Sequence, residues 1–96
     1  MRPSEALERH RADIRRIVAD NRACNPRVFG SVLRGVDGEG SDLDILVDTL
    51  EDTNLFHIGA ILADLEELLG VRIDVVTSSG LPERFRAQVV AEALPV

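Results

Sequence analysis

Apolar residues recur with the 3–4 spacing of a helix in three segments of the chain. The first segment predicts a helix that Ser4 caps and that ends near residue 21, and its apolar positions are Leu7, Ile14, Ile17 and Val18. The second predicts a longer helix that ends at Gly70, with an apolar stripe formed by Ile58, Ile61, Leu62, Leu65, Leu68 and Leu69. A last helix is expected from Pro82 onward, and its apolar side comprises Leu81, Phe85, Val89 and Leu94.

Three further segments have the features of strands. RVFGS, at residues 27–31, predicts a short strand that runs into Gly30, and residues 31–35 predict one helical turn before a loop. DLDILVD, at residues 42–48, and VRIDVVT, at residues 71–77, alternate apolar and polar positions as half-buried strands do. Three strands among three long helices predict an α/β (α+β) fold, in which a small mixed sheet of about three strands packs with helices.

Length and composition limit the class of protein. Ninety-six residues, of which 45% are hydrophobic, suit a single domain over residues 1–96. The charged N-terminal segment lacks the apolar core of a signal peptide, and the single cysteine, Cys24, cannot form an internal disulfide. We therefore expect a cytoplasmic protein in which Cys24 is buried as a small apolar group.

The charge balance bears on possible partners. The formal net charge is −6, and the chain has no Trp or Tyr and only three Phe residues. Binding to a nucleic-acid backbone requires clustered Lys and Arg, and stacking on bases requires aromatic side chains. We therefore expect no direct nucleic-acid ligand, whereas a protein partner is compatible with this charge.

Two aspartates occupy alternate positions at the start of the second predicted strand. Asp42 and Asp44 thus share one face of it, about 6.5–7 Å apart along the chain. Asp74 occupies a polar position of the third predicted strand. One interpretation is a solvent-exposed strand face. The other is a site for divalent cations, because Mg²⁺ prefers oxygen ligands and lets substrate phosphates complete its coordination shell.

Gly30 and Ser31 favour the second interpretation. They end a predicted strand and open a helical turn, where free backbone N–H groups bind phosphate and glycine permits a close approach. An anion site beside carboxylates can hold the metal–triphosphate complex that nucleotidyl transfer requires. Arg34 would either contact phosphate or brace the loop through an ion pair.

The joint spacing of these residues resembles a known signature. Gly30-Ser31, ten intervening residues and Asp42-x-Asp44 are similar to the signature of the DNA polymerase β-type nucleotidyltransferase superfamily. The fuller pattern, FGSxxRG followed by SDLDILV and later RIDVV, resembles its smallest branch, the minimal nucleotidyltransferases. These are antitoxin partners of HEPN-type ribonuclease toxins. The resemblance is strongest over residues 27–77.

The resemblance implies roles for five residues. Gly30 and Ser31 would bind the triphosphate of the nucleotide. Asp42 and Asp44 would be catalytic and would hold Mg²⁺. Asp74 would be the third catalytic and metal-binding carboxylate and would help to deprotonate the attacking hydroxyl.

The resemblance also implies a reaction and a partner. AMP would pass from ATP to a hydroxyl of a HEPN-type ribonuclease toxin, a tyrosine hydroxyl, and would neutralise that toxin. Because residues 1–96 leave no room for an acceptor-binding domain, we expect the hydroxyl on the partner protein. The alternative is an antitoxin without catalytic activity that neutralises the toxin by binding alone.

Overall fold

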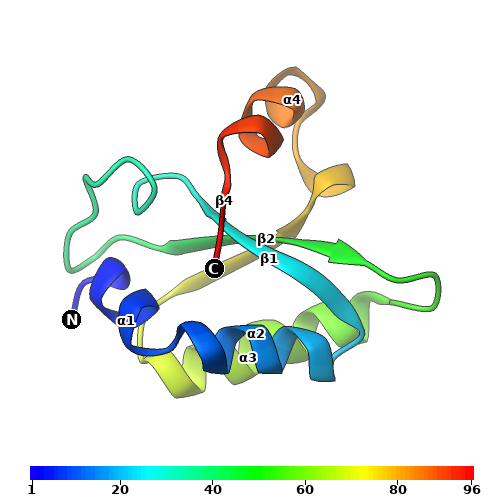
Figure 1. Cartoon of the computed structure of the whole chain (residues 1–96), viewed down its shortest axis with the longest axis horizontal. Coiled ribbons are helices and arrows are strands. Elements are labelled where there is room, and N and C mark those ends of the chain that lie inside the picture. The colour runs from blue at the N-terminus through cyan, green and yellow to red at the C-terminus, as the bar shows by residue number, and fades with distance from the viewer.

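A computed structural model describes residues 1–96 and shows a four-stranded sheet with helices on both sides (Figure 1). The strands lie in the order β3-β2-β1-β4 and comprise β1 (Ala23–Phe29), β2 (Leu43–Thr49), β3 (Ile73–Thr77) and β4 (Leu94–Pro95). β1 is antiparallel to β2 and to β4, whereas β2 and β3 are parallel. The predicted mixed α+β architecture is confirmed, but the sheet has four strands and not three.

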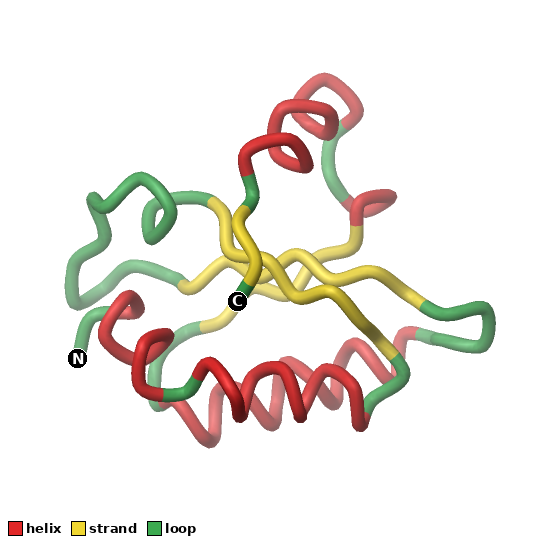
Figure 2. Tube along the Cα trace, in the orientation of Figure 1, coloured by secondary structure: helices red, strands yellow, loops and turns green.

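The helices divide between the two faces of the sheet. They comprise α1 (Pro3–Arg9), α2 (Arg11–Asp20), α3 (Leu55–Leu69) and α4 (Glu83–Glu92), and a short 3₁₀ turn, η1 (Ser78–Gly80), precedes α4. The first three helices lie along one face, and α4 stands on the opposite side (Figure 1). Figure 2 shows that the long loop between β1 and β2 lies beside α1.

The hydrophobic core lies between the sheet and the helices α1 to α3. Fourteen buried residues form it, and β2 contributes Leu43, Ile45 and Val47, while α3 contributes Ile61, Leu65 and Leu69. Each fully buried aliphatic side chain stabilises the fold by about 1.5–3 kcal/mol. This burial sends residues 43, 45 and 47 toward α3, so the intervening residues of β2 face α4.

The first predicted helix is two helices in the structure. The chain leaves the helical region at His10 (φ −126°, ψ 22°), which separates α1 from α2. Ser4 is not the cap, because α1 already begins at Pro3. The backbone N–H of Ser4 instead donates to the Asp37 carboxylate at 2.9 Å, which ties α1 to the loop between β1 and β2.

Two further predictions are wrong. Leu94 does not continue the last helix, because Ala93 (φ −58°, ψ 138°) ends α4 and Leu94 pairs with Val28 in the sheet. Cys24 is exposed, because β1 buries Ala23 on the core side and directs the next side chain away from it. None of the helices is both long enough and apolar enough to cross a membrane.

Candidate active site

The sheet brings two of the predicted carboxylates side by side. Asp44 on β2 is the register partner of Asp74 on β3, and paired residues of parallel strands point to the same face. On the other side of β2, Phe29 of β1 pairs with Asp44. The side chains of Asp44 and Asp74 therefore lie on the α4 side of the sheet, opposite the hydrophobic core.

Gly30 lies directly against the Asp44 carboxylate. A Cβ atom at residue 30 would lie 2.2 Å from Asp44 Oδ2 and 3.1 Å from its Cγ. The backbone at Gly30 also has a φ of +76°, in the left-handed region that side chains disfavour. Only glycine satisfies both conditions, so the turn after β1 can approach Asp44 closely.

Asp42 lies beside this pair but has a different partner. It immediately precedes β2, is exposed, and accepts a contact of 3.0 Å from Arg72 Nε. Arg72 also donates to the backbone carbonyl of Gly40 at 2.8 Å. The guanidinium group thus joins the end of the β1–β2 loop to the start of β3, and it holds Asp42 in place.

The electrostatics of this region centre on Asp44. Burial, followed by the negative charges of Asp74 and of Asp42, raises the pKa of Asp44 to about 6. The positive charge of Arg34 acts in the opposite direction. Asp48, farther along the same face of β2, is neutralised by an ion pair with Arg27. The site therefore carries concentrated negative charge that a cation would stabilise.

The turn after Gly30 presents backbone donors next to these carboxylates. The N–H of Arg34 donates to the Gly30 carbonyl at 3.1 Å, and that of Val36 donates to the Ser31 carbonyl at 3.0 Å. The N–H groups of Ser31 and Val32 donate no hydrogen bond within the chain. Such unpaired donors at a turn are suited to an anion such as phosphate.

Arg34 takes no part in bracing the loop through an ion pair. It appears in none of the ion pairs of the structure, and its side chain is exposed. Because it lies beside Gly30 and its charge acts on Asp44, it can contact an anion bound at the turn.

The chemistry of the three aspartates fits a hard divalent cation, because such a cation prefers carboxylate oxygens as ligands. A bound cation would also relieve the repulsion between the three carboxylates. The arrangement is nevertheless not a closed ligand cluster: no three His, Cys, Asp or Glu side chains group as metal ligands do. Asp44 and Asp74 share a face of the sheet, while Asp42 is paired with Arg72. The ligand roles of these residues stay predictions.

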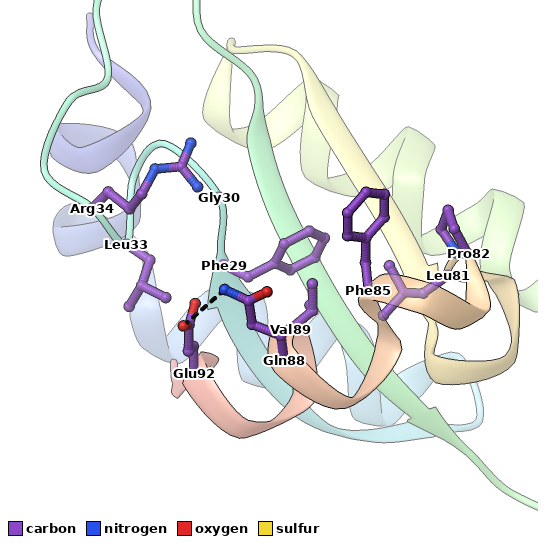
Figure 3. Close-up of a pocket in the computed structure, with 10 residues that line it drawn as sticks. All are labelled: Phe29, Gly30, Leu33, Arg34, Leu81, Pro82, Phe85, Gln88, Val89 and Glu92. Atoms are coloured by element: carbon purple, nitrogen blue, oxygen red, sulfur yellow. Dashed lines mark hydrogen bonds between the residues drawn. The ribbon is translucent and has the colours of Figure 1, made fainter.

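A cavity of about 370 Å³ lies between the Gly30 turn and α4 (Figure 3). Its apolar walls include Phe29 and Leu33 on one side and Leu81, Phe85 and Val89 on the other. Its polar groups belong to Arg34, Gln88 and Glu92. Sequence reasoning missed Phe29, Gln88 and Glu92, because no local spacing indicates that α4 folds back over the end of β1.

Comparisons with known proteins agree with this geometry. The family described as "Nucleotidyltransferase domain" matches residues 8–96. The chain is 42% identical over 69 residues to protein adenylyltransferase MntA of Thermococcus cleftensis, a match that covers 72% of this chain and 70% of that protein.

Solved structures show the same fold. One, titled "Structure of putative minimal nucleotidyltransferase", matches with a TM-score of 0.87 and 43% sequence identity. The match covers 97% of this chain and 95% of the chain in that structure. Another, titled "Crystal structure of the toxin-antitoxin with AMP-PNP", is similar in fold, with a TM-score of 0.73 and 22% sequence identity. The match covers 88% of this chain and 69% of the chain in that structure.

Proposed function

Because this chain belongs to the nucleotidyltransferase family, we propose that it transfers AMP from ATP to a tyrosine hydroxyl of a HEPN-type ribonuclease toxin and so neutralises it, with Mg²⁺ as cofactor. The observation that carries the proposal is the pairing of Asp44 with Asp74 directly beside the Gly30 turn. Its relative in Thermococcus cleftensis is named a protein adenylyltransferase, which supports a protein as the acceptor.

The reaction assigns a task to each group of the site. The unpaired N–H of Ser31, its hydroxyl and Arg34 bind the triphosphate. The attacking oxygen forms a bond to the α-phosphorus, the bond to the β-phosphate oxygen breaks, and pyrophosphate leaves. Asp74 accepts the proton of the hydroxyl. Asp42 and Asp44 would hold Mg²⁺, which offsets the negative charge of the phosphates when it is bound.

Intact-mass measurement of the toxin tests this proposal. After incubation with the protein, ATP and Mg²⁺, the toxin should gain the mass of one or more AMP groups. The Asp42→Asn, Asp44→Asn double variant should leave its mass unchanged. Asp48→Asn is the matched control, because Asp48 lies on the same face of β2 but is paired with Arg27. If the double variant labels the toxin as the parent does, the proposed roles of the two carboxylates are wrong.

One observation favours the alternative of an antitoxin without catalytic activity. Asp42 is engaged with Arg72, and the acidic residues do not form a closed ligand cluster. In that case the toxin would be neutralised without any gain in mass, and the double variant would neutralise it equally well. The same experiment therefore separates the two functions.

A further inference from the structure

The cavity beneath α4 adjoins the proposed triphosphate site, and its lining contains none of the three carboxylates. Gly30 and Arg34 form one end of it, whereas none of Asp42, Asp44 and Asp74 lines it (Figure 3). An attacking hydroxyl must lie within hydrogen-bonding reach of the carboxylate that takes its proton. This cavity is therefore not suited to the reacting end of an acceptor, and it is suited to a part of the nucleotide that does not react.

Two aromatic side chains line the cavity. Phe29 projects from β1 and Phe85 from α4, and the space of about 370 Å³ between the turn and the helix is large enough for a purine. Bases commonly stack on aromatic side chains in protein sites. A chain with no Trp or Tyr and three Phe residues places two of the three here.

The rim of the cavity carries a polar pair that can read a base edge. Gln88 Nε2 donates to Glu92 Oε1 at 3.2 Å, and both residues belong to α4 (Figure 3). Both side chains are exposed, and in this hydrogen bond the Gln88 carbonyl and its second N–H remain available. The 6-position and N1 of adenine present a donor beside an acceptor, whereas those of hypoxanthine present an acceptor beside a donor. An amide that is oriented by Glu92 matches only one of these patterns.

We propose that the cavity between the Gly30 turn and α4 binds the adenine base of the nucleotide, with Gln88 reading its amino edge. Phe85 supplies the stacking surface, and Glu92 is a positioning residue that holds the Gln88 amide. The proposal rests on the proposed function for the choice of ATP.

Calorimetric titration of the whole protein with ATP and with ITP tests the assignment, because the two nucleotides differ only at the base edge. With Mg²⁺ and no partner present, we expect ATP to bind about tenfold more tightly than ITP. In Gln88→Leu the two affinities should agree within about twofold, and Glu92→Ala should reduce the ATP-to-ITP ratio in the same direction. Glu83→Gln, also on α4 but outside the cavity, is the matched control and should keep the parent ratio.

Inorganic tripolyphosphate separates the base from the phosphate site. Phe85→Ala should weaken ATP and ITP alike by about tenfold or more, while tripolyphosphate binds as it does to the parent. Equal binding of ATP and ITP to the parent, a preference for ITP, or a preference that survives Gln88→Leu would each overturn the base assignment.

The failure of the base assignment can be told apart from the failure of the proposed function. If ATP and ITP bind equally but the toxin still gains the mass of AMP, only the base assignment is wrong. If Gln88→Leu and Phe85→Ala raise the KM for the toxin and leave ATP binding unchanged, the cavity binds the acceptor, and the assignment is wrong. If the parent binds neither ATP nor tripolyphosphate, both proposals are wrong.

Discussion

Replacing Gly30 with alanine should displace the Asp44 carboxylate and destabilise the protein more than the same change elsewhere. The new Cβ atom would lie 2.2 Å from Asp44 Oδ2, too close for any pair of non-bonded atoms. Gly35 provides the matched control, because its φ of +72° is close to the +76° of Gly30 while no atom lies within 4 Å of a Cβ placed there. The two substitutions therefore share the backbone cost and differ in the contact with Asp44.

The magnitudes follow from these two contributions. An alanine in the left-handed region costs about 1–2 kcal/mol, partly offset in both variants by the lower entropy of the unfolded chain. At Gly30 the Asp44 side chain must also leave its rotamer, which adds about 0.5–1.5 kcal/mol. We therefore expect Gly30→Ala to lower the free energy of unfolding by about 1 kcal/mol more than Gly35→Ala does.

Urea unfolding followed by far-UV circular dichroism measures the difference, since the chain has no Trp or Tyr to report by fluorescence. The same pair of substitutions is then measured in an Asp44→Ala background. In that background the atom nearest to the new Cβ at residue 30 is the Cβ of residue 44, at an ordinary distance of 3.5 Å. The additional loss of stability at Gly30 should therefore disappear. Equal costs for the two glycines in the parent, or an excess that persists without the carboxylate, would refute the reasoning.

Two further predictions concern charge. Because the pKa of Asp44 is raised from 3.8 to about 6, its favourable contribution to stability is complete below pH 3.8 and is lost as the pH rises through 6. Asp44→Asn should therefore stabilise the metal-free protein at pH 8 and should have no such effect at pH 4. The pKa shift corresponds to roughly 3 kcal/mol, which solvent screening reduces to an expected gain of about 1–1.5 kcal/mol in the free energy of unfolding. Urea titrations with EDTA at the two pH values measure this gain. Asp37 is buried, and the hydrogen bond from the Ser4 backbone holds the pKa of its carboxyl below the usual value. The contribution of the ionised Asp37 to stability is therefore present above pH 3.8 and is lost below it. Asp37→Ala should lower the free energy of unfolding by about 1–2 kcal/mol at pH 7 and by less near pH 3. Equal losses at the two pH values would contradict this account.

Most of the fold could be predicted from local pattern. α3 extends to Leu69 and ends at Gly70 as its apolar stripe predicts, and β2 alternates as its sequence does. These features depend on residues two to four positions apart, whose relative placement the backbone geometry decides. The break at His10 and the pairing of Leu94 with Val28 could not be predicted in this way, because each depends on how a segment meets the rest of the protein.

The sequence by itself determined which residue types the site contains and that Asp44 points away from the buried Leu43 and Ile45, since alternation along a strand is a local property. Only the tertiary structure decided that Asp74 pairs with Asp44, that Arg72 takes Asp42 as its partner, and that α4 closes a cavity over the Gly30 turn. These contacts join segments far apart along the chain. Their geometry follows from strand order, register and the burial of the core, which no local spacing records.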